Sequence, residues 1–305
     1  MAVAALALLA VVALYAFNVR PALANLALSR SITLTRLDDL PAALVAMDES
    51  LALGTSMRFE ARQKFNNLTL KALRSSAFTP EAKRVLFEKT ERELLANIRE
   101  EPEDAFHLVY LLTLYNGSEH VDPSVLDRIP AVFEQANRLS PGRAPLYYEL
   151  GQAKMSQGKF DEGISAFREA VTIAPNVMEA HWNLGAALVV GGYEAEGEAE
   201  FQRAAELGLN LKSLRHLTRV LRVYNAKRDF RKLAETYEAI AAIEPSAPVY
   251  ASLAAAYKEL GEIEKAKIAV EQAVALDGSY APEAEEFLRS LRGVKGARGS
   301  QQGLR

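Results

Sequence analysis

The sequence predicts an all-α protein in which short helices stack in pairs as an α-solenoid, preceded by one N-terminal apolar helix. Alanine, leucine and glutamate dominate the 305 residues, and β-branched runs are scarce, which favours helices over strands. Residues 144–177 read as two amphipathic helices joined by a turn. Their pattern returns 34 positions later, from Gly151 to Gly185, and a fixed period of this kind is typical of helix-turn-helix repeats.

Each marked position of the repeat has a physical role. Gly151 lets a neighbouring helix approach closely, and Gly158 ends the first helix because glycine tolerates a positive φ. Phe167 is predicted to fill the space between successive repeats. Pro175 stops the second helix, since proline lacks a backbone donor. Ala170 keeps the two helices of the pair close together. The residues of the next repeat that correspond to Gly151, Gly158, Phe167 and Ala170 are Gly185, Gly192, Phe201 and Ala204.

The residues that close successive helix pairs recur at intervals of 33–39 residues, and they are Pro102, Pro141, Pro175, Leu209, Pro245 and Gly278. These features resemble the tetratricopeptide repeat (TPR) family, closely over residues 144–277 and more weakly over residues 24–142. The resemblance implies a right-handed superhelix whose concave face binds a protein or peptide segment. Trp182 and four tyrosines are predicted to pack in its core, namely Tyr147, Tyr148, Tyr250 and Tyr257.

Residues 2–19 are apolar apart from Asn18, and the run is just long enough to cross a bilayer. We expect a retained membrane helix here. A cleaved signal peptide, with cleavage near residues 22–24, and a buried core helix are the alternatives. Positive charges follow the run at Arg20, Arg30 and Arg36, so the positive-inside rule predicts cytoplasmic repeats.

The predicted organisation has four parts. They are a transmembrane or signal-anchor helix at 1–20, diverged helical repeats at 21–142, a TPR solenoid with a C-terminal capping helix at 143–292, and a disordered tail at 293–305. Within the second part, Thr79 followed by Pro80 predicts a helix start, because it combines a capping hydroxyl with a proline in the first turn.

No catalytic motif, cofactor site or small-molecule substrate site is evident, so we expect a protein that is not an enzyme. The four histidines show no metal-ligand spacing. His120 beside Glu119 and Asp122 could hold a weak metal, but a solvated loop is the simpler interpretation. The chain lacks cysteine, which excludes a thiolate metal site, and its net charge of −3 without a basic block argues against nucleic acid.

Four polar residues are predicted to line the groove on first helices of the repeats. They are Gln152, Asn183, Arg215 and Arg219. Arg215 and Arg219 are four residues apart and project on the same side of a helix. The set resembles the clamp with which chaperone-binding TPR proteins hold a peptide's terminal carboxylate, although Tyr148 replaces a clamp lysine. Ordinary solvated charges are the alternative interpretation.

A second resemblance concerns the start of the chain. The apolar helix, the following segment FNVRPALANLALSRS, a helix pair and then the repeats resemble the end of bacterial O-antigen ligase or polymerase-like membrane proteins. That resemblance implies a regulatory tail and carries over no activity, because no residue of the catalytic part is present. A soluble or secreted TPR protein is the third hypothesis.

Overall fold

The computed structural model describes residues 2–299, with side chains through Leu291, and all regular elements in this range are helical. The predicted all-α class is therefore confirmed. The chain divides into two compact units, Met1–Lys159 and Phe160–Arg305. Within each unit most helices contact their neighbours in chain order, as expected of a solenoid.

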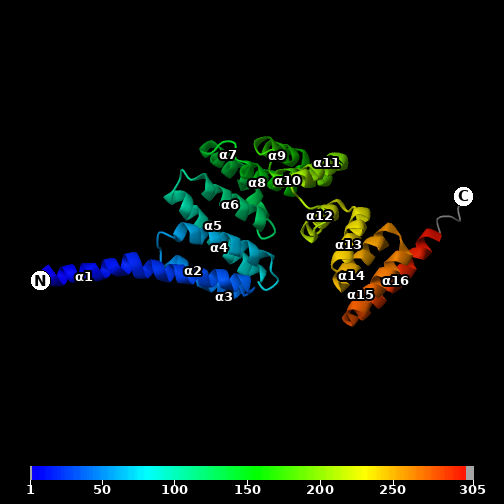
Figure 1. Ribbon diagram of the computed structural model, residues 1–305, viewed down its shortest axis with the longest axis horizontal. Coiled ribbons are helices and arrows are strands. Elements are labelled where there is room, and N and C mark those ends of the chain that lie inside the picture. The colour runs from blue at the N-terminus through cyan, green and yellow to red at the C-terminus, as the bar shows by residue number, and fades with distance from the viewer. Residues whose placement is uncertain (1, 300–305) are drawn as a thin grey trace. The chain divides into compact units, whose positions relative to one another are not determined.

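The first unit begins with one uninterrupted helix (Figure 1). It comprises α1 (Ala2–Leu14), a π-helical turn (Tyr15–Val19) and α2 (Arg20–Arg36). Side chains of α1 are all exposed, and the first buried residue is Ala24 in α2. This observation contradicts a buried core helix at residues 2–19. Among the described residues, this helix alone is long and apolar enough to cross a membrane.

The remaining helices of the first unit follow as close neighbours. They are α3 (Leu40–Ala52), α4 (Arg58–Arg74), α5 (Pro80–Glu100), α6 (Ala105–Ser118), a 3-10 turn (Pro123–Arg128), α7 (Ile129–Leu139) and α8 (Ala144–Ser156). As predicted, α5 starts at Thr79, whose hydroxyl accepts a hydrogen bond from the Ala82 N–H at 3.2 Å. The first helices of successive helix pairs also contact one another: α4 contacts α6, and α6 contacts α8.

The second unit contains the more regular repeats. Its helices are α9 (Phe160–Ile173), α10 (Met178–Gly191), α11 (Glu194–Glu206), α12 (Leu214–Lys227), α13 (Phe230–Ile243), α14 (Ala247–Leu260), α15 (Ile263–Leu276), a 3-10 turn (Gly278–Tyr280) and α16 (Ala281–Gly299). One apolar core runs from α10 to α16 and includes Phe201, Tyr257 and Leu291.

The repeat positions behave as the sequence predicts. Gly192 ends α10 at φ 97°, in the left-handed region that favours glycine. A Cβ on Gly185 would lie 2.9 Å from the backbone oxygen of Gly197, so glycine permits the close approach of α10 and α11. Phe167 and Phe201 are only 5% and 2% exposed, which confirms that both rings are buried.

The four-part organisation stays a prediction, and the structure gives the bounds of the compact units and of the last helix. The border of the compact units falls between α8 and α9, inside the repeat at 144–177, because α8 packs on α6 and α7. At the C-terminal end, α16 continues to Gly299, through the first part of the predicted tail at 293–305. Residues 300–305 of that tail lie outside the described residues.

Candidate functional site

Helix α12 carries the strongest concentration of one charge among the first helices of the second unit. Arg215, Arg219 and Arg222 recur at intervals of four and three residues, so they share one side of the helix. The helix contains no aspartate or glutamate. Its start is fixed by Ser213, whose hydroxyl accepts a hydrogen bond from the His216 N–H at 3.2 Å. The result is a basic face, defined here by these three arginines.

Arg219 is held in place by two side chains of α10. Its Nη1 lies 3.0 Å from Oε1 of Glu179, and its guanidinium carbon lies 3.5 Å from the centroid of the Trp182 ring. A cation over the face of an indole is attracted by the ring quadrupole, most strongly when the pair is partly desolvated. The Arg219 side chain is only 21% exposed, so its orientation is largely set by these contacts.

A small aromatic cluster lies directly beneath this contact. The Trp182 indole N–H donates to Nδ1 of His216 at 3.3 Å, which requires an unprotonated Nδ1. Phe201 packs against Trp182 at 6.1 Å and meets the His216 ring edge to face at 6.0 Å. Burial lowers the pKa of His216, and the positive charge of Arg219 lowers it further. The cluster is therefore uncharged at neutral pH.

The two other arginines of the basic face are free to meet a ligand. Arg215 and Arg222 are exposed, and neither forms an ion pair with any residue that the structure describes. By contrast, Lys227 at the end of α12 pairs with Glu194 at 2.9 Å. The uncompensated positive charges of Arg215 and Arg222 thus lie on the same helix face as the guanidinium of Arg219, which is already oriented.

The structure places the four predicted groove residues in different settings. Arg215 and Arg219 lie on α12 of the second unit, together with the half-buried Asn183 on α10. No hydrogen bond between described residues joins Asn183 to either arginine; Arg219 instead contacts Glu179 and Trp182. Gln152 is exposed on α8 of the first unit and stays a sequence-based prediction.

Sequence reasoning missed the two partners of Arg219. Trp182 packs against the core, as the helical spacing of aromatic residues predicts, but it is half-buried and its ring face also meets a cation. Glu179 lies three residues earlier on the same side of α10. The sequence pattern that could have revealed this contact is an acidic residue and an aromatic residue three positions apart on the first helix of one repeat, with arginines on the first helix of the next repeat.

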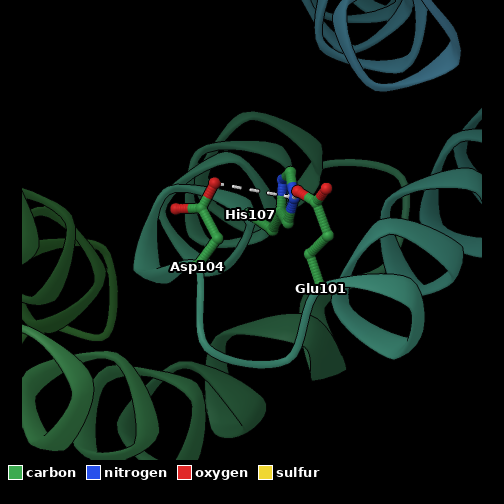
Figure 2. A group of neighbouring side chains, drawn as sticks. All are labelled: Glu101, Asp104 and His107. Atoms are coloured by element: carbon green, nitrogen blue, oxygen red, sulfur yellow. Dashed lines mark hydrogen bonds and ion pairs between the residues drawn. The ribbon is translucent and has the colours of Figure 1, made fainter. Parts of the chain in front are cut away.

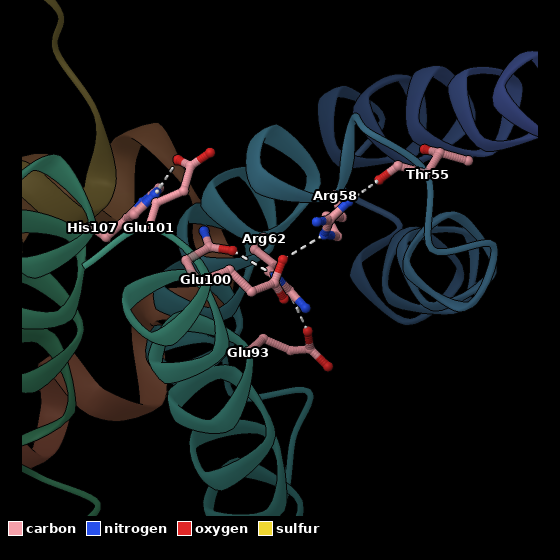
Figure 3. A network of polar contacts seen from close by, with 8 residues as sticks. Thr55, Arg58, Arg62, Glu93, Glu100, Glu101 and His107 are labelled. Atoms are coloured by element: carbon pink, nitrogen blue, oxygen red, sulfur yellow. Dashed lines mark hydrogen bonds and ion pairs between the residues drawn. The ribbon is translucent and has the colours of Figure 1, made fainter. Parts of the chain in front are cut away.

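A second polar group joins α4 to α5 in the first unit (Figure 3). Nε of Arg62 lies 2.8 Å from Glu93, while its Nη1 donates to Asn97 at 2.7 Å and to Glu100 at 3.0 Å. Arg58 pairs with the same Glu100 at 2.6 Å. The hydrogen bond from Arg58 is the largest cause of the lowered pKa of Glu100. Because these charges compensate one another, this group stabilises the helix pair and leaves no charge for a ligand.

Next to it lies a group of side chains that could hold a metal ion (Figure 2). Glu101 follows α5, Asp104 precedes α6, and His107 lies in the first turn of α6. One donor atom of each lies within 4.8 Å of the others. Sequence reasoning predicted no metal site and did not single out this trio. The spacing of three residues crosses a loop, so no helical periodicity reveals it.

Comparisons with known proteins agree with the helical-repeat architecture. Residues 144–177 and 247–280 match the sequence profile of the tetratricopeptide repeat. The fold is similar to that of TTC0263, a thermophilic TPR protein of Thermus thermophilus, at 18% identity and a TM-score of 0.51, covering 66% of this chain and 98% of that chain. A comparison with curated protein sequences found no match.

Two further structures are similar at lower scores. They are pilF of Pseudomonas aeruginosa (18% identity, TM-score 0.46, 76% of this chain and 99% of that chain) and YrrB, described as a TPR protein with an unusual peptide-binding site (20% identity, TM-score 0.40, 63% and 97%). Of the three, only the Thermus structure is similar enough to bear on the fold. The chain is thus a helical-repeat protein. Specifically, two of its segments, residues 144–177 and 247–280, match the tetratricopeptide repeat.

Proposed function

We propose that this chain is a non-catalytic TPR scaffold that binds an acidic peptide segment of a partner protein on the basic face of α12. The supporting observation is that Arg215 and Arg222 are exposed without an ion pair among the described residues, beside an Arg219 that Trp182 already orients. Guanidinium groups bind carboxylates by paired, charge-assisted hydrogen bonds, and a pre-oriented guanidinium loses less entropy when it does so.

The peptide's terminal carboxylate is the group that this face fits best. Arg215 and Arg219 lie one turn apart, so a single carboxylate can bridge them, and an acidic side chain upstream would reach Arg222. The amide of Asn183 is free of hydrogen bonds to described residues and offers a further donor on α10. Gln152, on α8 of the first unit, stays a sequence-based prediction.

The same proposal includes attachment to a membrane through residues 2–19. The exposed apolar side chains of α1 include Val3, Leu6 and Leu9. Two exposed aromatic residues, Tyr15 and Phe17, precede Arg20, and this order is typical of the end of a membrane helix at the polar interface. Arg20, Arg30 and Arg36 favour a cytoplasmic location for the repeats.

Two alternatives depend on the same exposed helix. The chain could be the regulatory tail of an O-antigen ligase or polymerase-like membrane enzyme, as the second sequence resemblance implies. It could also be a secreted TPR protein whose first helix is a cleaved signal peptide. The sequence upstream of residue 1 in the genome tests the former, and the intact mass of the mature chain tests the latter.

A peptide library with free and amidated C-termini tests the binding proposal. We expect the chain to select peptides with a free terminus and acidic residues near it. Amidation replaces one carboxylate oxygen by an amino group, so the peptide loses its terminal negative charge and the two lone-pair acceptor positions of that oxygen. We expect this change to weaken binding about tenfold or more. Equal binding of the free and amidated forms would contradict the carboxylate site, and absence of any peptide binding would contradict the scaffold proposal itself.

A further inference from the structure

We propose that Glu101, Asp104 and His107 form a binding site for a divalent transition-metal ion, best matched by Zn²⁺. This site lies in the first unit and is independent of the proposed peptide-binding face. Figure 2 shows the two carboxylates turned toward the His107 ring from either end of the short loop between α5 and α6.

The distances suit a small metal ion. Nε2 of His107 lies 3.1 Å from Oε2 of Glu101 and 3.7 Å from Oδ2 of Asp104. In tetrahedral zinc sites, ligand bonds of about 2.1 Å place neighbouring donor atoms about 3.4 Å apart. Asp104 can offer Oδ2 because its other oxygen, Oδ1, caps α6 by accepting a hydrogen bond from the Phe106 N–H at 2.9 Å. The helix cap therefore holds this carboxylate in position.

The histidine is buried and faces the cluster with the nitrogen that would bind the metal. His107 is 2% exposed, and its ring stacks on Phe59 at 5.7 Å with an interplanar angle of 17°. Outside the cluster, the described residues give this ring no hydrogen bond, since Nδ1 has no partner. Nε2 carries at most one hydrogen, so it can donate a full hydrogen bond to only one of the two carboxylates. A divalent cation bound between Nε2 and the carboxylate oxygens would attract both carboxylates.

The neighbouring cations do not compensate these carboxylates. Arg58 and Arg62 are engaged with Glu93 and Glu100, and Figure 3 shows Glu100 and Glu101 turned to different partners. No lysine or arginine of the described residues lies within ion-pair distance of Glu101 or Asp104. Two carboxylates without a lysine or arginine partner thus flank the His107 ring, and this donor set of one imidazole and two carboxylates suits Zn²⁺ better than Mg²⁺ or Ca²⁺.

Two properties of the bound state follow. Three protein ligands leave a coordination position for water, and a metal bridge would tie the end of α5 to the start of α6. Nδ1 of His107 lacks the acceptor that usually supports a metal-bound histidine. We therefore expect an affinity about 10–100-fold below that of a site with complete outer-shell hydrogen bonds.

Calorimetric titration of the full chain in detergent with zinc chloride tests this site. We expect one ion per chain at this site, with affinity lowered at least about tenfold by Glu101→Gln and by Asp104→Asn. Asparagine retains the helix cap, so the second variant should fold normally. The matched control is Glu103→Gln, which removes an exposed acid from the same loop and should leave the affinity unchanged.

NMR of the histidine ring nitrogens identifies which histidine binds. At a zinc concentration that just saturates the wild-type chain, we expect the His107 resonances to shift in the wild-type chain and in Glu103→Gln, and to shift much less in Glu101→Gln. Wild-type zinc affinity equal to that of Glu101→Gln would overturn the proposal. So would zinc-dependent shifts confined to His120, His181 or His216.

Discussion

The guanidinium carbon of Arg219 lies 3.5 Å from the centroid of the Trp182 ring, which joins α12 to α10 in the second unit. Glu179 completes the contact with an ion pair at 3.0 Å. The arginines of the basic face are therefore of two kinds. Arg219 is oriented and already compensated, whereas Arg215 and Arg222 are uncompensated among the described residues. A carboxylate ligand must therefore compete with Glu179 for Arg219 but not for the other two.

Glu179→Gln should strengthen the binding of acidic peptides. The change removes the internal competitor for Arg219 while it keeps an amide oxygen that can still orient the guanidinium. Because a partly exposed ion pair contributes roughly 0.2–1 kcal/mol, we expect a gain in affinity of about 1.4- to fivefold. Fluorescence titration measures it directly, since Trp182 is the single tryptophan of the chain. Weaker binding by this variant would show that Glu179 serves the ligand rather than competing with it.

Acidification should disturb the cluster under Arg219. The pKa of His216 is lowered from its ordinary value of 6.5, first by burial and then by Arg219. Because the pKa of His216 is lower in the folded chain than in the unfolded chain, the neutral ring contributes fully to the free energy of unfolding above pH 6.5. This contribution is lost as the pH falls through the lower pKa of the folded chain. Protonation of Nδ1 also ends the hydrogen bond from Trp182.

We expect a Trp182 fluorescence transition with a midpoint below pH 6.5, accompanied by a fall in unfolding free energy. His216→Phe is the control and should abolish the fluorescence transition, because it keeps a ring and removes the titratable group. A midpoint above the ordinary histidine pKa would contradict the burial of a neutral histidine at this position.

Phe201→Ala should destabilise the second unit by about 3–5 kcal/mol, because truncation of a fully buried aromatic ring loses transfer free energy and leaves a cavity. Phe201 is 2% exposed and contacts both Trp182 and His216. Chemical denaturation measures the change. Phe160→Ala is the control, since that ring is 41% exposed and should cost much less. Equal losses for the two variants would contradict the predicted role of the repeat phenylalanine.

Deletion of residues 1–19 should release a folded, soluble chain from the membrane fraction. The side chains of α1 are exposed, and the first buried residue is Ala24, so the solenoid core does not depend on α1. We expect the full chain to resist carbonate extraction and the deletion variant to keep its helical circular dichroism spectrum. A full chain that is soluble with its N-terminus intact would rule out the membrane helix.

Much of the fold was predictable because the repeat signals are local. Glycine at a left-handed turn, as at Gly192, and proline after a helix are determined by backbone sterics, which a sequence displays directly. The cap at Thr79 and the burial of Phe167 and Phe201 follow from equally local patterns. These features recur with a fixed period, and the period identifies the architecture.

The candidate sites were less predictable because they depend on contacts between elements. The pairing of Arg219 with Glu179 spans 40 residues and depends on how α12 packs on α10. Likewise, Glu101 and His107 meet only because the chain turns between α5 and α6. Periodicity places a residue on a helix face but does not determine which side chain of the next helix it contacts.

The measurement that tests the central claim most directly is the affinity of the best acidic peptide for Arg215→Ala and for Arg231→Ala. Both arginines are exposed in the second unit, but Arg215 lies on the basic face of α12 and Arg231 lies on α13. We predict that Arg215→Ala weakens binding about tenfold, as expected for loss of a charge-assisted hydrogen bond, and that Arg231→Ala changes it less than about twofold. Equal effects of the two substitutions, or no effect of Arg215→Ala, would contradict a peptide-binding site on α12.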